Sequence, residues 1–171
     1  MKDVRTGLML TPVPAEFVDG VWSKVSEIME RSVKTAEGKY KVEDLYPEIM
    51  DNQIVLWIVA DHDRDDEIIA AITTRLIEYP QGNSMAMDWI GGKRMKDWLP
   101  LAQESISRYA RDHKCKYLEG YGRKGWDRGL RKYGGKPDYI ARKMDLENTK
   151  QRIKRTDDTN TVTWTRMMDH G

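Results

Sequence analysis

Three extended segments follow one another in the middle of the sequence, and only short polar turns separate them. Gln53 to Asp61 is almost continuously apolar, as expected for a strand that is buried on both faces. Glu67 to Tyr79 is rich in β-branched residues, and Ser84 to Ile90 follows a Pro-Gln-Gly-Asn turn. Because consecutive strands joined by tight turns pair antiparallel, the sequence predicts an antiparallel meander at the centre of the fold.

Segments with helical periodicity lie on both sides of this meander. Apolar residues recur at helical spacing from Ala15 to about Thr35, which predicts one long amphipathic helix. Lys41 to Asp51 predicts a short second helix that contains a proline. After the meander, Gly91 and Gly92 are expected to break the strand.

The third predicted helix has Asp97 as its N-cap and Pro100 in its first turn, and it runs to about His113. Further strands are expected over residues 7–13, 116–121 and 138–144, and a short helix over 125–133 closed by Gly134. The element order is therefore β-α-α-β-β-β-α-β-α-β. This order predicts an α/β (α+β) fold, with a mixed, largely antiparallel sheet flanked by helices.

The length and composition favour one domain with a polar tail. The chain has 171 residues, of which 39% are hydrophobic, enough for one domain with a core. Residues 1–146 are expected to form the domain, and residues 147–171 a tail that is disordered or binds a partner. Three apolar residues near the end of the tail are candidates for that contact: Trp164, Met167 and Met168.

Charge and composition exclude several classes of function. The net charge of +1 argues against a globally nucleic-acid-binding or membrane-binding surface, though not against a local patch. The single cysteine, Cys115, permits no intrachain disulfide and is expected to act as a small buried hydrophobe. The three histidines lie far apart, so no metal site is predicted. No signal peptide or membrane-spanning run is present, which favours the cytoplasm, or assembly from a cytoplasm into a virion.

Two segments carry a resemblance to a known family. Ser105 to Leu118 (SISRYARDHKCKYL) resembles the long helix and following strand of GNAT acetyltransferases, and Trp126 to Tyr139 (WDRGLRKYGGKPDY) resembles their last helix and final strand. The resemblance covers about residues 7–145. The same region is similar to GNAT-like proteins of tailed bacteriophages. One such group is the internal virion proteins of short-tailed phages, for which the resemblance implies the fold without known catalysis.

The resemblance implies an acetyl-CoA site at the start of the third helix, where the family pattern is Q/R-x-x-G-x-G/A. Arg94 then occupies the Q/R position, while Asp97 and Leu99 stand where the glycines should be and Pro100 removes one amide. A displaced phosphate loop remains open as an alternative. It would use these residues: Gly91, Gly92, Lys93, Arg94 and Lys96. The other interpretation is a strand end followed by solvated basic side chains.

The family's general acid is a tyrosine four residues before the glycine that closes the last helix. Counting back from Gly134 reaches Leu130, and the nearby Tyr133 has the spacing of a packing residue. Glu78 and Asp88 are candidate bases for an amine substrate, although carboxylates on strand surfaces are commonly just solvated.

Three functions remain in competition. The first is a non-catalytic phage protein that docks through its tail on other virion proteins such as portal, tail or capsid, with a homo-oligomer possible within the assembly. The second is an acetyl-CoA-dependent N-acetyltransferase, and only this function requires a cofactor. The third is nucleic-acid binding. Helical spacing argues against it, because it places Trp126 and Tyr133 in the core, where they cannot stack on bases. Its candidate basic residues are Arg123, Lys124, Arg128, Arg131, Lys132 and Lys136.

Overall fold

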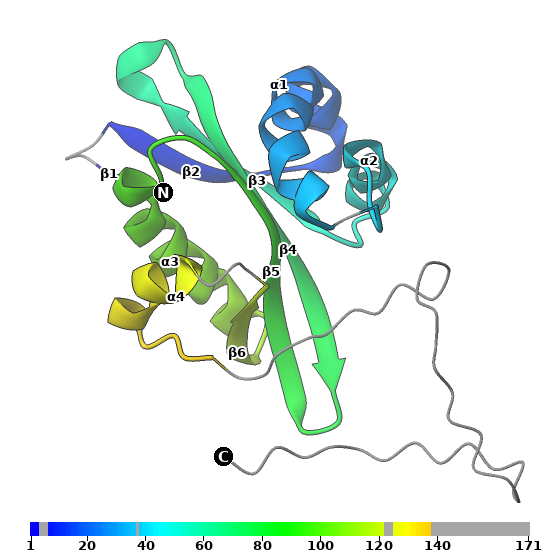
Figure 1. Cartoon of the computed structure of the whole chain (residues 1–171), viewed down its shortest axis with the longest axis vertical. Helices are drawn as coiled ribbons and strands as arrows, with labels where there is room; N and C mark the ends of the chain where they lie inside the picture. The colour runs from blue at the N-terminus through cyan, green and yellow to red at the C-terminus, as the bar shows by residue number, and fades with distance from the viewer. Residues whose placement is uncertain (4–6, 37, 122–124, 138–171) are drawn as a thin grey trace, which may run out of the picture. The chain divides into compact units, whose positions relative to one another are not determined.

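The computed structural model describes residues 1–3, 7–36, 38–121 and 125–137 (Figure 1). Within this part, Met1–Lys136 form one compact unit. The strand predicted over 138–144 and the tail predicted from residue 147 lie outside the described residues. The same holds for the tail residues Trp164, Met167 and Met168, and for Arg123 and Lys124.

A single sheet of six strands organises the fold. Its spatial order follows the sequence: β1 (Lys2–Asp3), β2 (Leu8–Val13), β3 (Val55–Asp61), β4 (Glu67–Tyr79), β5 (Gly82–Gly92) and β6 (Cys115–Gly120). All neighbours are antiparallel except β5 and β6, which run parallel. The predicted meander is confirmed as β3-β4-β5. The two-residue β1 was not predicted.

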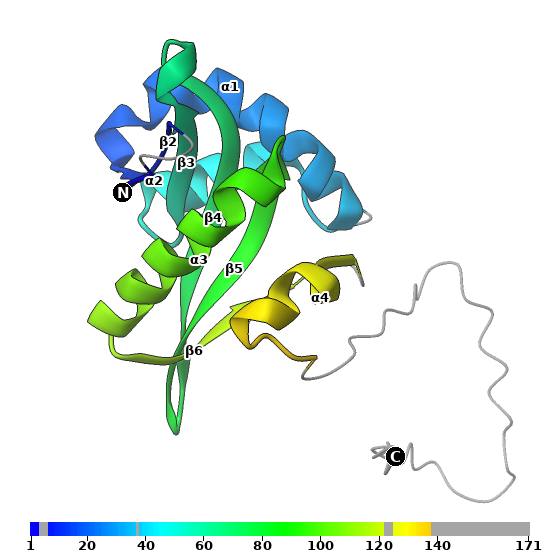
Figure 2. The same cartoon turned by 90° about the vertical axis from the view of Figure 1, so that its left-hand side faces the viewer.

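Helices cover both faces of this sheet (Figures 1 and 2). On one face lie α1 (Ala15–Val33) and α2 (Leu45–Met50), and on the other lie α3 (Met95–Asp112) and α4 (Gly125–Leu130). Short 3₁₀ turns follow α1, precede α2 and follow α4. Gly134 adopts φ 82°, a left-handed conformation that glycine takes without strain, and closes the last helical segment as predicted. The mixed α/β architecture expected from the sequence is confirmed.

Each face of the sheet has its own hydrophobic core. The α1 face is centred on Val18, Val25 and Met29 of α1 against Leu56 and Ala71 of the sheet. The α3 face has a larger cluster, in which fully buried α3 residues meet alternate residues of the central strands. Its members include Trp98, Ala102, Ile106, Trp57, Ile72 and Met85. These two cores fix the orientation of α1 and α3 on the sheet.

Gly91 and Gly92 are the last two residues of β5, whereas the prediction had them break the strand after Ile90. Both belong to β5 and pair with Ala71 and Ala70 of β4. A Cβ on Gly91 would lie 2.6 Å from the carbonyl oxygen of Ile28 in α1. Gly92 has φ 133°, and a Cβ there would lie 2.5 Å from the Cα of Ala70. The glycines are therefore needed because α1 and β4 approach the backbone of β5 so closely.

Helix α3 begins three residues earlier than predicted, since its N-cap is Arg94 and not Asp97. Its first residue is Met95, preceded by Arg94 in a left-handed conformation with φ 59°. Asp97 is therefore the third helical residue and not the N-cap. Pro100 is the sixth, so its missing N–H is not one of the free amides of the first turn. The prediction that Pro100 removes an amide from the helix entrance is accordingly wrong.

Strands β5 and β6 separate towards the start of α3. The parallel ladder ends at the pair Met87 and Gly120, whereas β5 continues to Gly92. A bulge interrupts the β4–β5 pairing at the same level. Thr73 lies opposite Trp89 and Thr74 opposite Met87, so Asp88 between them has no opposite residue in β4. The Thr73 hydroxyl accepts a hydrogen bond from the Trp89 amide at 3.2 Å across this bulge.

Candidate functional site at the entrance of helix α3

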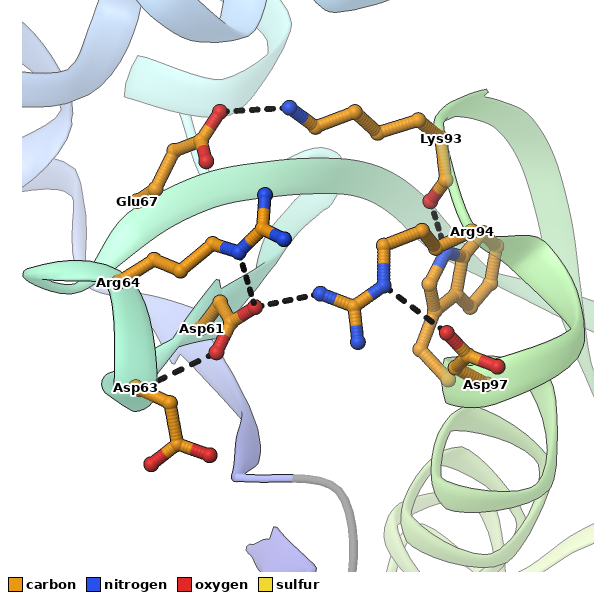
Figure 3. Close-up of polar contacts among 8 residues, drawn as sticks. Asp61, Asp63, Arg64, Glu67, Lys93, Arg94 and Asp97 are labelled. Atoms are coloured by element: carbon orange, nitrogen blue, oxygen red, sulfur yellow. Dashed lines mark hydrogen bonds and ion pairs between the residues drawn. The ribbon is translucent and has the colours of Figure 1, made fainter.

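Three strand ends meet beside the first turn of α3. Because β3, β4 and β5 are antiparallel neighbours, the end of β3, the start of β4 and the end of β5 lie at the same edge of the sheet. Asp61 pairs with Glu67 at this edge, and Lys93 and Arg94 follow the last residue of β5. Only these two residues connect β5 to α3. Figure 3 shows the charged side chains that this arrangement brings together.

Arg94 is held between two carboxylates. Its Nη1 forms an ion pair with Oδ2 of Asp61, and its Nε donates to Oδ2 of Asp97 at 2.9 Å (Figure 3). The Asp61 side chain is only 4% exposed, while that of Arg94 is 33% exposed. Arg64 adds a second cation, with its Nε 3.9 Å from the same Asp61 oxygen. The guanidinium of Arg94 thus spans the gap between the end of β3 and the first turn of α3.

The protonation of this cluster follows from its contacts. Burial alone raises the pKa of the Asp61 carboxyl, but hydrogen bonds from Arg94 and from the Asp63 amide, with the nearby positive charges, outweigh it. The net effect is a pKa of Asp61 below its ordinary value. Hydrogen bonding to Asp97, and then to Asp61, raises the pKa of Arg94 further above its usual high value. Asp61 and Arg94 are therefore both charged at neutral pH.

The two-residue connection is also fixed through Lys93. Its amide donates to the carbonyl of Ile69 at 3.0 Å, and its own carbonyl accepts from Nε1 of the buried Trp98 at 2.8 Å. The Lys93 ammonium lies 2.7 Å from Oε1 of Glu67. This hydrogen bond lowers the pKa of the Glu67 carboxyl, and burial offsets the effect only in part. Backbone and side chains of the connection are thus already engaged.

The charges of the ion-paired groups at this entrance cancel. Three carboxylates, Asp61, Glu67 and Asp97, face three cations, Arg64, Lys93 and Arg94. A diphosphate needs free amides at a helix start, a close backbone approach and surplus positive charge. Here the two carboxylates beside Arg94 repel an anion, and the tight turn offers no glycine loop to surround one. No side chain caps the first-turn amides of α3, but the carboxylates beside Arg94 disfavour the pyrophosphate of acetyl-CoA at this entrance.

The residues of the alternative phosphate loop have separate roles. Gly91 and Gly92 lie within β5, where they admit α1 and β4, and Lys93 and Arg94 form the ion pairs described above. Lys96 is exposed on the first turn of α3. The five residues do not form a continuous loop around an open space.

The candidate bases Glu78 and Asp88 are not brought together. Glu78 is exposed and lies opposite Asn83 near the β4–β5 turn. Asp88 lies five residues further along β5, about 17 Å away at the rise of an extended strand. Its carboxylate accepts two hydrogen bonds from Arg75, at 2.8 and 3.2 Å, and its side chain is 15% exposed. The hydrogen bonds to Asp88 raise the pKa of Arg75.

The remaining candidates are placed as packing or surface residues. Tyr133 is half-buried against the core of the α3 face, with the Lys132 ammonium 5.1 Å from its ring centre. Cys115 is half-buried against the same core, and burial raises the pKa of its thiol. His62 forms an ion pair with Asp66 in the turn after β3. Within the described ranges no group of three or more histidine, cysteine or carboxylate residues is suited to hold a metal ion.

Asp61, Arg64 and Glu67 were missed as members of the site. In the sequence they belong to a polar turn of the kind that usually connects two strands. The signal that identifies them is topological: in an antiparallel meander the first turn lies at the same edge as the end of the third strand. Charged residues at both places, DHDRDDE and KR, are expected to meet there.

Comparison with solved structures assigns the fold. An aminoglycoside acetyltransferase from an uncultured soil metagenomic sample matches with a TM-score of 0.59 at 10% identity, over 84% of this chain and 99% of that chain. A predicted acetyltransferase from Clostridium acetobutylicum with acetyl-CoA gives 0.59 at 13% identity, over 84% and 99%. A Trypanosoma brucei acetyltransferase gives 0.59 at 12% identity, over 81% and 99%.

The chain therefore has the fold of GNAT-like acetyltransferases, which the resemblance of its C-terminal half implied. No protein-family profile and no curated protein matches the sequence. The identities of 10–13% establish the fold alone. In the part of the chain that the structure describes, no helix has both the length and the apolar character to cross a membrane.

Proposed function

We propose that this protein uses the GNAT fold as a non-catalytic structural component, and that it docks on other proteins of an assembly through its C-terminal tail. The observation that carries the proposal is the neutral ion-pair cluster around Arg94 at the start of α3. An acetyltransferase of this fold binds the diphosphate of its cofactor at the start of α3. In this protein the Arg94 guanidinium and the carboxylates of Asp61 and Asp97 lie there instead.

The candidate catalytic residues support the same conclusion. Both carboxylate oxygens of Asp88 accept hydrogen bonds from Arg75, which makes Asp88 a weaker base for an amine. Glu78 is exposed, and Tyr133 packs against the core. A general base must lie within hydrogen-bond reach of the reacting amine, beside the bound thioester. These three residues come from different parts of the sheet and helices.

The proposed setting is a bacteriophage virion. It rests on the resemblance of residues 105–118 and 126–139 to GNAT-like proteins of tailed phages, and on the apolar residues of the tail. A polar segment with Trp164, Met167 and Met168 has too few apolar residues for a core of its own and suits folding upon a partner. The partners proposed are portal, tail or capsid proteins.

Incorporation into particles tests the proposal. Virions produced with the full chain are compared with virions that carry a chain ending at Glu147, and with a Trp164→Ala, Met167→Ala, Met168→Ala variant. We expect both changed proteins to fold with an unaltered melting temperature and to be missing from purified particles. Normal incorporation of the shortened chain would show that the tail is not the docking segment.

Acetyl transfer to an amine is the second candidate function. One observation favours it: β5 extends beyond the end of β6 and is bulged at Asp88, which leaves strand backbone beside the α3 entrance. Incubation with acetyl-CoA and a panel of polyamines, aminoglycosides and amino-terminal peptides tests it. Acetylated product that depends on Glu78 or Asp88 would favour this function over the structural one.

A further inference from the structure

The last helical segment carries an unbalanced positive charge. Residues 128–136 contain four basic side chains and no acidic one, and the neighbouring acids along the chain are Asp127 and Asp138. The whole chain has a net charge of +1, so the residues outside this segment together carry −3. This segment is one of two short basic runs in the sequence, and the other, over residues 150–155, lies outside the described residues.

These four cations are exposed and have no acidic partner among the described residues. Arg128, Arg131, Lys132 and Lys136 are all solvent-exposed, and none of them takes part in the ion pairs of the described chain. Some exposed basic residues elsewhere face a carboxylate one helical turn away, as Lys24, Lys34 and Arg108 do. The basic segment lacks such pairing, so its field extends into solvent.

The helical segment presents three of the four cations on one side, and Lys136 follows in the next few residues of the chain. Arg128 and Arg131 are three residues apart and Arg128 and Lys132 four, which places all three on the same side of the helical segment. The other side faces α3: a Cβ on Gly129 would lie 3.7 Å from Leu99, and Tyr133 packs against the core. Figures 1 and 2 show α4 beside α3 on the outside of the sheet.

The basic segment has no exposed large apolar side chain among its described residues, and this favours a polyphosphate over an acidic protein as its partner. Protein interfaces gain most of their affinity from buried aromatic or aliphatic residues near their centre. Between residues 128 and 136 the described side chains include no exposed large hydrophobic residue, since Leu130 and Tyr133 are half-buried. Binding to a polyphosphate requires no such anchor, because release of counterions supplies the free energy.

We infer that Arg128, Arg131, Lys132 and Lys136 form a binding surface for the phosphate backbone of duplex DNA, without sequence preference. Tyr133 is turned into the core, so the surface offers no stacking platform of the kind that single-stranded nucleic acid requires. The inference is independent of the proposed structural role, since a charged surface can operate on either a catalytic or a non-catalytic domain.

Fluorescence anisotropy with a labelled 20-base-pair duplex tests the inference on the full chain. With four phosphate contacts, the logarithm of the affinity is expected to fall with a slope of about −3.6 against the logarithm of salt concentration. Between 50 and 200 mM salt this corresponds to a loss of roughly 150-fold. No binding at 50 mM salt, or binding that salt does not weaken, would overturn the inference.

Charge-matched variants identify the surface. The Arg128→Gln, Arg131→Gln, Lys132→Gln, Lys136→Gln protein should lose the salt-dependent binding, and Arg131→Gln or Lys136→Gln alone should each reduce the slope by about one. The control removes the same charge elsewhere, from four exposed residues near the end of α1: Arg31, Lys34, Lys39 and Lys41. Equal losses in the two quadruple variants, at equal melting temperatures, would show that net charge and not this surface binds the DNA.

Competition with polyglutamate separates nucleic acid from an acidic protein. Duplex DNA carries one charge per roughly 1.7 Å, a denser line of charge than a polypeptide presents. We expect polyglutamate at the same charge concentration to displace little of the duplex. Displacement equal to that by unlabelled DNA would overturn the assignment to nucleic acid in favour of an acidic protein partner.

Discussion

Replacement of Gly91 by alanine tests whether this glycine serves helix packing or a phosphate loop. The added Cβ would lie 2.6 Å from the carbonyl oxygen of Ile28, where real Cβ contacts stay above 3.0 Å. The obstacle is helix backbone, so α1 must move away from β5 or β5 must bend. Overpacking of this kind costs about 1–3 kcal/mol. For a chain of this size the melting temperature should fall by roughly 2–12 °C.

Gly20→Ala is the matched control for this substitution. Gly20 lies inside α1, is exposed, and an added Cβ there meets nothing within 4 Å. Alanine is a better helix former than glycine, so this variant should be more stable by roughly 0.5–1 kcal/mol. Both proteins are compared with the unchanged chain by urea unfolding and by thermal melting. If Gly91→Ala were as stable as the unchanged protein, the close approach of α1 would not be the reason for glycine at this position.

Three further predictions concern buried polar groups. Thr74→Val should cost about 1–3 kcal/mol in urea unfolding because it leaves the buried Trp57 N–H, now bonded to the Thr74 hydroxyl at 2.9 Å, without an acceptor; an unchanged midpoint would contradict this. Asp61→Asn should lower the melting temperature by a constant amount above about pH 5. The difference from the unchanged protein should shrink as pH falls below 3.8, because the folded protein then takes up a proton at Asp61, whose pKa is lowered. A difference that stays constant down to pH 2 would refute the ion pair with Arg94. The raised pKa of Cys115 predicts slower alkylation by iodoacetamide at pH 8 in the folded protein than in urea, and equal rates in both would contradict its burial.

Local sequence patterns predicted most of the fold. The β-branched run predicted the bounds of β4, and helical periodicity located α1, because both elements bury one regular face against the sheet. The turn residues after β4 fixed the meander, and the short connections left only antiparallel pairing possible. The two-residue β1 has too few residues to carry a periodic pattern.

The errors arose where a distant contact decides the local conformation. A glycine pair is compatible with a strand end and with a strand that another backbone approaches closely, and only the contact between Gly91 and Ile28 distinguishes them. Asp97 has the residue type of an N-cap, but the left-handed Arg94, which is paired with Asp61 from a distant strand, precedes a helix that starts at Met95.

The candidate site was predicted only where its residues are close in sequence, because its other members come from distant strands. Asp97 stands beside the helix start, as its position in the sequence implied, and its carboxylate pairs there with Arg94. The contribution of Asp61 depends on the meander bringing the end of β3 next to the end of β5. Such a partner can be predicted only after the strand order is known.

Calorimetric titration with acetyl-CoA tests the central claim most directly, because it measures whether the entrance of α3 accepts the diphosphate. We expect no saturable heat from the unchanged protein at ligand concentrations up to about 1 mM, which limits any binding free energy to about −4 kcal/mol or weaker. A saturable heat at lower concentration that disappears in an Arg94→Ala protein of unchanged fold would contradict the account.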